Sequence, residues 1–321
     1  MPDPVVSVVV PTHNRAARLG RLLDGLRAQT IGTDAFEVVL CDDASSDPAV
    51  ATVLHEAAHD GRLHLRVLRR EASGGPAVAR NVGWRAALAP LVAFVDDDCV
   101  PVPTWLQALV DARDAAGVDD LVIQGPVDPD PAEYPHRYGP FSTTLWVKEA
   151  SPWFETANIA YPRALLDRLG GFDEELVIAG EDSDLGWRAV EAGATVVWAA
   201  QALVHHGVIA QGPWGRMWKG RRWRYVPAAF ARHEGLRREL QYGVFWNDRH
   251  RWLFGALLAL LLLRRRGPGW SFLRWWFGGP YLKHLTHYRT GPLLAPYRLA
   301  CDVVEVVSIG EGAVRHRIVM L

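Results

Sequence analysis

Strand-like and helix-like segments alternate along the first hundred residues, and this alternation restricts the fold more than any other feature. The β-branched run VVSVVVP at residues 5–11 predicts a strand buried on both faces, and residues 12–30 follow it with leucines at helical spacing. The same order returns at residues 36–61 and 64–88, before a fourth strand at 91–98. Alternation of this kind predicts an α/β domain of Rossmann type, with a mostly parallel sheet flanked by helices.

The regular alternation ends after the fourth strand. The proline-rich stretch at residues 121–135 is expected to run over the surface, and a helix is expected from about Asp182 to Ala192. The last third of the chain has a different composition, because eight of the fourteen tryptophans lie there among many arginines. We therefore expect two domains, an α/β domain at residues 1–210 and a basic, Trp-rich, mainly helical region at 211–321.

The two parts of the chain carry opposite charge. Residues 1–211 hold 16 Lys or Arg against 30 Asp or Glu, and residues 212–321 hold 19 against 6, although the net charge of the whole chain is only −1. This asymmetry indicates different partners for the two parts. We expect cations or a metal-bound anion to bind the acidic part, and an anionic surface to bind the basic part.

Cysteine usage and the first residues favour a cytoplasmic protein. Cys41, Cys99 and Cys301 show neither paired nor metal-ligand spacing, which is typical of a reducing compartment. The start of the chain has no basic leader and only a short apolar run, so we expect no export signal. The longest apolar run, Trp252 to Leu263, has 12 residues, whereas a spanning helix needs roughly 20.

Polar residues follow three of the predicted parallel strands. Pro11 and Thr12 end the first strand, Asp42 and Asp43 end the second, and Asp96–Asp98 end the fourth. In open α/β sheets, ligands bind outside the carboxyl ends of the strands. These residues should therefore meet in one crevice.

The three consecutive aspartates need a positive partner, because like charges at the end of a buried strand are poorly solvated. Carboxylate oxygens in this position suit Mg²⁺ or Mn²⁺, which normally rests on one or two carboxylates and on the phosphates of a substrate. The sequence thus predicts a metal diphosphate at residues 96–98. The alternative is a solvated acidic turn.

Six segments of the chain carry a known pattern. They are VSVVVPTHNR, FEVVLCDDASSD, GGPAVARNVGWRAAL, AFVDDDCVPVP, GGFDEEL and GEDSDLGWRAVEAGA. In this order and spacing they resemble the GT-A glycosyltransferases of family 2, and the likeness covers roughly residues 4–210. The resemblance implies a GT-A fold with a C-terminal helical extension, and transfer of a sugar from a nucleotide-diphosphate donor.

The resemblance places the nucleotide at the first two strand ends. Pro11, Thr12 and Asp43 would hold the base, because a carboxylate at a strand tip can accept the imide N–H of a uracil or thymine ring. Asp42 is the alternative acceptor. Arg80 would face the crevice and bind the diphosphate, although the sequence pattern alone also permits a surface position.

The same resemblance assigns metal and ribose contacts. Asp96 and Asp97 would contact ribose or metal, and Asp98 is the favoured metal ligand, with Asp96 as a second. Adjacent strand residues face opposite ways, so at most one of His205 and His206 can point into the crevice. The resemblance favours His206 as a further ligand, and a plain edge histidine is the alternative.

Glu181 and Asp182 form a second acidic site. Inverting sugar transfer needs a carboxylate to take the proton of the acceptor hydroxyl, and the resemblance assigns this catalytic base to Asp182, with Glu181 as its neighbour. The alternative role of Asp182 is to cap the helix that follows. Asp184 and Arg188, four residues apart, should form an ion pair on that helix.

Candidates for the acceptor side are Asn158, Arg222 and Trp223. The segment KGRRW is similar to the Q-x-x-R-W motif of processive family members, with Lys219 in place of glutamine. That departure, and the lack of an apolar run of membrane-spanning length, argue against a processive polysaccharide synthase.

The basic, Trp-rich region has two interpretations that are compatible with each other. It forms a helical cap on the α/β domain, or it lies on anionic lipid at the inner face of the plasma membrane, where Trp and Arg are favoured. Nucleic acid is not an expected partner, because no RNA or DNA motif appears and the acidic domain would repel a phosphate backbone.

The sequence therefore favours an inverting family 2 hexosyl- or deoxyhexosyltransferase that uses Mg²⁺ or Mn²⁺ and a nucleotide-diphospho-sugar. The composition of the basic region suggests a lipid-linked or cell-envelope glycan as acceptor. One rival is a nucleotidyltransferase that makes sugar nucleotides, but the glycine-rich phosphate loop of such enzymes is missing after the first strand. The other rival is a sugar-nucleotide-binding protein without catalysis.

Overall fold

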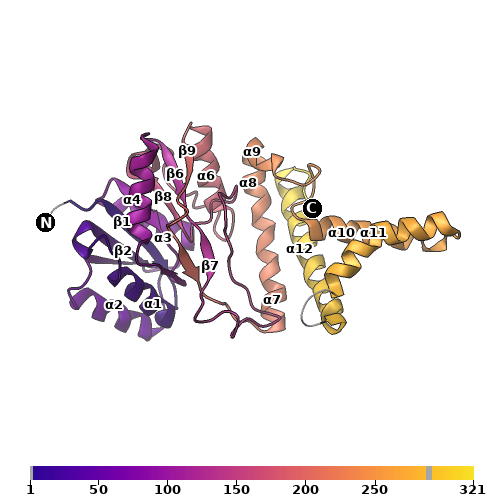
Figure 1. Cartoon of the computed structure of the whole chain (residues 1–321), viewed down its shortest axis with the longest axis horizontal. Coiled ribbons are helices and arrows are strands. Elements are labelled where there is room, and N and C mark those ends of the chain that lie inside the picture. The colour runs from indigo at the N-terminus through magenta and orange to yellow at the C-terminus, as the bar shows by residue number, and fades with distance from the viewer. Residues whose placement is uncertain (1–2, 287–290) are drawn as a thin grey trace. The chain divides into compact units, whose positions relative to one another are not determined.

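The computed structural model describes residues 3–286 and 291–321. The chain divides after Ala210 into two compact units. The first unit contains a central sheet with helices on both faces, and the second is built from helices (Figure 1). The α/β fold and the helical C-terminal region predicted from the sequence are confirmed.

The secondary structure of the first unit alternates between strands and helices over most of its length. Its strands are β1 (Val6–Thr12), β2 (Phe36–Asp42), β3 (Leu65–Arg69), β4 (Leu91–Phe94), β5 (Cys99–Pro101), β6 (Leu121–Gln124), β7 (Val127–Pro129), β8 (Ile159–Pro162), β9 (Thr195–Trp198) and β10 (Val204–His206). Its helices are α1 (Ala16–Arg27), the 3₁₀ turn η1 (Thr33–Ala35), α2 (Pro48–His59), α3 (Pro76–Ala86), α4 (Trp105–Ala116), α5 (Arg163–Leu169) and α6 (Glu181–Glu191).

The main sheet has seven strands in the order β3-β2-β1-β4-β8-β6-β9. All neighbours in it pair in parallel except β8, which runs antiparallel to both β4 and β6. A second sheet, β5-β10-β7, has three strands. Because β1, β2 and β4 are parallel neighbours, their carboxyl ends lie at one edge of the main sheet, as expected from the sequence.

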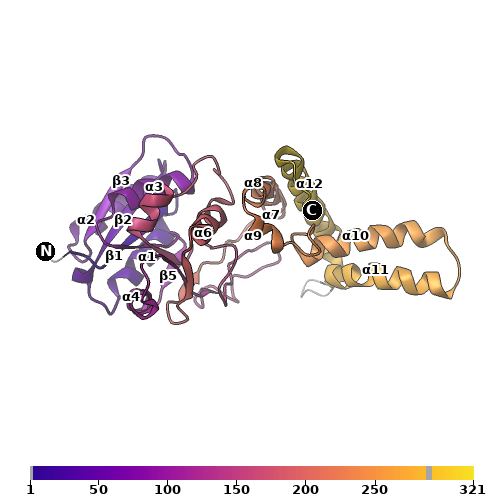
Figure 2. The same ribbon diagram turned by 90° about the horizontal axis from the view of Figure 1, so that it is seen from above.

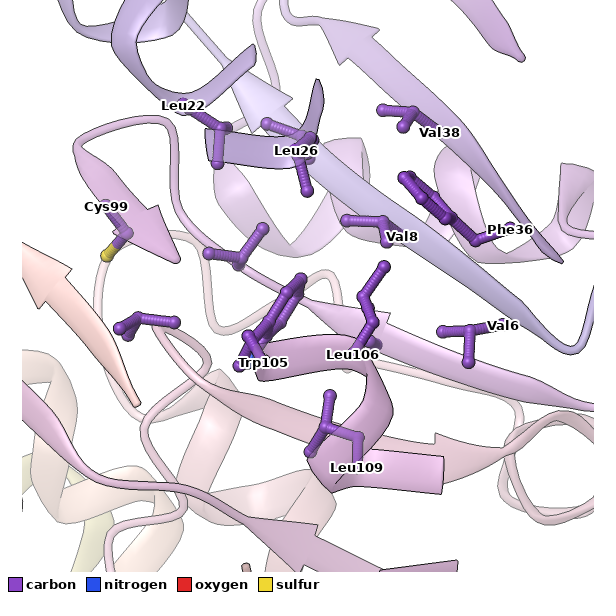
Figure 3. Packing of buried hydrophobic residues seen from close by; sticks show 14 of the residues in the cluster. Val6, Val8, Leu22, Leu26, Phe36, Val38, Cys99, Trp105, Leu106 and Leu109 are labelled. Atoms are coloured by element: carbon purple, nitrogen blue, oxygen red, sulfur yellow. The ribbon is translucent and has the colours of Figure 1, made fainter. Parts of the chain in front are cut away.

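Alternate residues of the central strands pack into two separate cores. Val8 of β1 belongs to the core that also contains Leu22 and Leu26 of α1 and Trp105 of α4 (Figure 3). Val9, the next residue, belongs to the core on the opposite face, with α3, α5 and α6. Both sets of valines are fully buried, so the β-branched run supplies the centre of the domain from two sides.

Two parts of the first unit differ from the sequence-based expectation. The antiparallel strand β8 has no clear signal in the sequence, because four residues of a buried strand lack a distinctive period. The stretch expected to run over the surface, residues 121–135, instead contains β6 and β7 and two buried acids, Asp130 and Glu133. Arg18 and Arg21 of α1 pair with these acids and account for their burial.

The second unit consists of helices and 3₁₀ turns. They are α7 (Pro213–Lys219), η2 (Gly220–Tyr225), α8 (Val226–Arg232), α9 (Glu234–Arg238), α10 (Asp248–Leu261), η3 (Leu262–Arg264), α11 (Pro268–Thr286), η4 (Gly291–Leu294) and α12 (Ala295–His316). Helices α10 and α11 form an antiparallel hairpin (Figure 2). In the described part of the chain, no helix has both the length and the apolar character needed to cross a bilayer.

A buried carboxylate connects three helices of the second unit. Asp302 of α12 accepts a hydrogen bond from Arg249 of α10 at 3.0 Å and one from Tyr281 of α11 at 2.9 Å, and His284 Nε2 lies 3.3 Å from it. Burial alone would raise the pKa of Asp302, but the hydrogen bond from His284 and the charge of Arg249 hold it below its usual range. Asp302 is therefore ionised and paired inside the unit.

We expect Asp302→Ala to lower the free energy of unfolding of the second unit by about 1–3 kcal/mol, because the buried Tyr281 hydroxyl and His284 lose this acceptor while Arg249 keeps its bond to Glu305. Urea unfolding followed by circular dichroism measures this change. The control is Glu234→Ala, which breaks an ion pair with Arg238 whose side chains are 70% and 76% exposed, and which should leave the transition unchanged. An unaltered transition for Asp302→Ala would contradict the prediction.

Candidate active site

The acids predicted at the end of β4 lie beside the end of β1. The hydroxyl of Thr12 donates to Asp97 at 2.8 Å, and Arg15, just after β1, donates to Asp97 at 2.9 Å and to Asp98 at 2.8 Å. Both carboxylates are buried. Burial and the charge of Asp98 raise the pKa of Asp97 to about 6, although Arg15 opposes the shift. Arg15 is thus shared by two buried carboxylates, whose combined negative charge is larger than the charge of Arg15.

His206 lies next to Asp98 because of strand pairing. In the second sheet His206 of β10 pairs with Cys99 of β5, which follows Asp98 directly, and His206 Nε2 is 3.5 Å from the carboxylate of Asp98. The Nδ1–H of His206 donates to the carbonyl of Gly207 at 2.8 Å, so Nε2 keeps its lone pair in the neutral ring. Of the two adjacent histidines, His206 is the one that contacts the aspartate cluster.

Arg80 joins the two acidic sites, which are far apart in sequence. Its guanidinium donates to Asp96 at 2.8 Å and to Glu181 at 3.0 Å. Only 5% of the Arg80 side chain is exposed, which rules out the surface position that the sequence left open. The end of β4 and the start of α6 are thus held together by one buried cation.

Asp182 lies in the first turn of α6, beside Glu181. The residue that caps this helix is Gly180, whose φ of +98° suits glycine, so Asp182 is not the cap. One oxygen of Asp182 accepts the backbone N–H of Ser183 at 2.8 Å. Burial and the charge of Glu181 raise the pKa of Asp182 well above its usual range, although Arg80 opposes the shift. The predicted ion pair between Asp184 and Arg188 forms at 2.8 Å.

Asp42 and Asp43, at the end of β2, have different surroundings. Asp42 accepts the backbone N–H of Ser45 and a hydrogen bond from Arg69, so it stabilises the turn after the strand. Asp43 accepts hydrogen bonds from Arg70, the hydroxyl of Ser73 and the backbone N–H groups of residues 74 and 75. The cap of α2 is a third acid, Asp47. The loop before α3 is therefore fixed on Asp43.

Comparison with known proteins identifies the chain. The family model described as "Glycosyl transferase family 2" matches residues 7–170, which include both strand-end acid groups. The chain belongs to glycosyl transferase family 2. Two family relatives are similar in sequence: a validoxylamine A glucosyltransferase of Streptomyces hygroscopicus subsp. jinggangensis (strain 5008), 34% identical over 218 residues, and a pre-mycofactocin glycosyltransferase of Mycobacterium tuberculosis (strain ATCC 25618 / H37Rv), 33% identical over 219.

These alignments cover 58% and 63% of this chain but only 51% and 42% of the respective relatives. The chain thus spans about half the length of the curated relatives that it matches. Solved structures agree in fold. A mannosyltransferase from Pyrobaculum calidifontis, in complex with GDP-Man and Mn²⁺, has a TM-score of 0.66 at 22% identity and covers 95% of this chain and 87% of that one. TarS 1–349 of S. aureus with UDP-GlcNAc has a TM-score of 0.52 at 20% identity, with coverages of 98% and 92%.

Two predicted acceptor-side residues of this family 2 chain lie in the second unit. The guanidinium carbon of Arg222 lies 4.2 Å from the ring centroid of Trp223. The rings of Trp223 and Trp246 pack edge-on, with their centroids 4.6 Å apart. The third, Asn158, is buried just before β8. Its side chain accepts from the indole of Trp105 at 2.8 Å and donates to two backbone carbonyls. Asn158 therefore stabilises the interior of the first unit, and its buried amide is not placed to contact an acceptor.

Sequence reasoning missed several side chains of the site. Arg15 and Arg70 contact the acids. Arg15 follows the first strand, whose carboxyl end was expected to line the crevice, so its position gave a signal. Arg70 follows the third strand, whose end was not among those expected there. No feature of the sequence indicated that Glu133 contributes to the site. It accepts the backbone N–H of Val208 at 2.7 Å and thereby fixes the chain just after β10.

Proposed function

We propose that this family 2 chain transfers a sugar from a nucleotide-diphosphate donor to an acceptor hydroxyl, with inversion at the anomeric carbon. The observation that carries the proposal is the bridge of Arg80 to Asp96 and Glu181, because it brings the acids after β4 and those at the start of α6 to one place. Donor and acceptor groups must meet there for a sugar to move between them. Family membership supports transfer over the nucleotidyltransferase alternative.

The donor's nucleoside lies, in this proposal, at the ends of β1 and β2. Pro11, Thr12 and Asp43 hold the base, with Asp42 as the alternative acceptor, and both acids also stabilise the loops beside them. Asp96 and Asp97 contact the ribose. A sugar-nucleotide donor is supported by the fold neighbours, since one was solved with GDP-Man and another with UDP-GlcNAc.

The residues around Asp98 fit a divalent cation. The raised pKa of Asp97 reflects burial and an excess of carboxylate charge, and the carboxylate of Asp98 and Nε2 of His206, 3.5 Å apart, offer two adjacent donor atoms. Among residues 3–286 and 291–321, no three His, Cys, Asp or Glu side chains are placed to hold a metal alone, which suits Mg²⁺ or Mn²⁺ shared with substrate phosphates. Asp98 and His206 would hold the ion, with Asp96 nearby. When bound, it would neutralise the departing nucleoside diphosphate.

Asp182 is the proposed base that accepts the proton of the acceptor hydroxyl. An ordinary aspartate is a weak base at neutral pH, and the raised pKa of Asp182, caused by burial and by Glu181, improves the match to this task. Glu181 is fixed by Arg80 and contributes charge beside the base. Arg80 donates to Asp96 as well as to Glu181, so it positions these two carboxylates in addition to any contact with the diphosphate.

The proposed acceptor is a lipid-linked or cell-envelope glycan, and the proposed location is the cytoplasm, peripheral on the inner face of the plasma membrane. Support comes from the excess of Lys and Arg in residues 211–321, with Arg222 and Trp223 as candidates for acceptor contacts. Nucleic acid is not among the proposed partners.

Calorimetric titration with UDP-, GDP- and dTDP-sugars, each with and without Mn²⁺, tests the proposal. We expect one nucleotide class to bind, and to bind far more tightly with Mn²⁺, as shared phosphate and carboxylate ligands require. Two incubations then separate the alternatives, one with the bound donor and an acceptor, the other with a sugar phosphate and a nucleoside triphosphate. Transfer to an acceptor supports the proposal, release of pyrophosphate from sugar phosphate and nucleoside triphosphate indicates a nucleotidyltransferase, and binding without any reaction indicates an inactive binding protein.

A further inference from the structure

The α10–α11 hairpin has small residues inside and large apolar residues outside. Gly255 lies so close to α11 that an added Cβ would be 2.8 Å from the carbonyl oxygen of Phe277. A Cβ added at Gly278 would lie 3.3 Å from the methyl group of Ala259, which is buried. The two helices approach closely through these small residues, and the bulky side chains are left to point away from the hairpin axis.

Ten large apolar side chains of the hairpin are exposed. They are Leu257, Leu258, Leu260, Leu261, Leu263, Trp270, Phe272, Trp275, Trp276 and Leu282. In a hairpin that faces water, side chains of this kind pack between the helices. Small residues between helices and large apolar residues on the outside are typical of helices in contact with lipid.

The charge around these side chains selects the kind of partner. The sequence contains no Asp or Glu between Asp248 and Asp302, but it contains nine Lys or Arg in that interval. Arg264–Arg266 are exposed in the turn between the two helices, close in sequence to the exposed leucines and tryptophans. A second copy of the hairpin would bring like charges together, whereas an anionic lipid surface attracts juxtaposed Lys and Arg.

The apolar part of the hairpin matches the depth of a membrane interface. The exposed leucines at 257–263 cover about two turns at the end of α10, or roughly 10 Å at 1.5 Å per residue. Interfacial helices bury their apolar faces about 5–10 Å into the boundary between headgroups and acyl chains. Tryptophan prefers this boundary, and arginine reaches from it to lipid phosphates.

We propose that residues 257–276, the turn-side half of the α10–α11 hairpin, insert into the interfacial layer of an anionic bilayer and anchor the chain there without spanning it. Leu261 and Trp275 enter the boundary region, and Arg264–Arg266 contact lipid phosphates. This anchor locates the membrane contact within residues 211–321 and does not depend on the transfer reaction, because vesicle binding is measured without donor or acceptor.

The experiment is cosedimentation of the full chain with vesicles of phosphatidylcholine, with or without an equal part of phosphatidylglycerol. We expect binding to the anionic vesicles that weakens in high salt, and little binding to phosphatidylcholine alone. Removing three positive charges by Arg264→Gln, Arg265→Gln and Arg266→Gln should reduce partitioning roughly 100-fold. Trp275→Ser should reduce it about tenfold through lost apolar burial.

The matched control is Trp214→Ser on α7, because Trp214 and Trp275 are 70% and 71% exposed and neither substitution opens a core. Trp214→Ser should bind vesicles as the unaltered chain does, and circular dichroism should confirm that all variants fold. The proposal fails if the unaltered chain binds no anionic vesicles at low salt, or if Trp275→Ser and Trp214→Ser bind equally. It also fails if light scattering shows a dimer that Trp275→Ser dissociates while vesicle binding is absent, since a second copy would then be the partner.

Discussion

Asp182→Asn should reduce the turnover number of sugar transfer on the order of 10³-fold while donor affinity stays within about a factor of two. The amide keeps the size of the side chain and its hydrogen bond from Ser183, but it cannot take a proton from the acceptor. The measurement is steady-state transfer together with calorimetric donor binding. Retained binding shows that the variant is folded and that the loss lies in the chemical step.

The matched control for this base is Glu191→Gln, which removes a carboxylate from the exposed far end of the same helix and should transfer normally. The pH profile gives a second view of the same group. Because burial and Glu181 raise the pKa of Asp182, the base is protonated over a wider acid range, and activity should fall with decreasing pH at values above those at which an ordinary aspartate titrates. A fully active Asp182→Asn enzyme would remove Asp182 as the base.

Asp98→Asn should abolish the gain in donor affinity that Mn²⁺ provides, with a loss of at least about 100-fold in metal-dependent binding, since even outer partners of metal ligands contribute 10–100-fold. The substitution preserves the shape of the side chain but removes the charge that faces His206 and Arg15. Calorimetry of the nucleoside diphosphate with and without Mn²⁺ measures the effect.

Asp119→Asn makes the same change of charge on an exposed loop of the first unit, and it should leave Mn²⁺-dependent binding unaltered. If Asp98→Asn bound the nucleotide with the full Mn²⁺ enhancement, the ion would lie elsewhere in the site. Binding that never responds to Mn²⁺, in either protein, would contradict the metal assignment as a whole.

Much of the fold and part of the site could be predicted from the sequence, because both follow from strand direction. Parallel neighbours end at one edge, so the proximity of Thr12 and Asp97, which are 85 residues apart, follows from the predicted strands. The choice between His205 and His206 could not be made from the residues alone. It depended on the pairing of β10 with β5, and antiparallel pairing between such short strands leaves no periodic signal.

Side-chain contacts that join three or more distant segments could not be predicted from the sequence. Arg80 was placed on α3, but its bonds to Asp96 and Glu181 depend on how α3 and α6 pack on the sheet. The surroundings of Asn158 could not be predicted, because Trp105 and the two carbonyls that use its whole amide lie 32 or more residues away in the sequence. Side-chain amides in interiors commonly serve backbone groups, and their partners are set by tertiary structure.

The reversed direction of β8 has a consequence for how such enzymes diversify. Because β8 starts where β4 ends, the segment that enters it opens onto the same edge as Asp96, and residues 152 and 153 bond to α6 beside Asp182. A segment inserted or exchanged ahead of β8 would therefore change the surroundings of the proposed catalytic acids without disturbing the paired strands. Replacing this one segment can thus change the surroundings of Glu181 and Asp182 while the strands that carry the proposed donor site are kept.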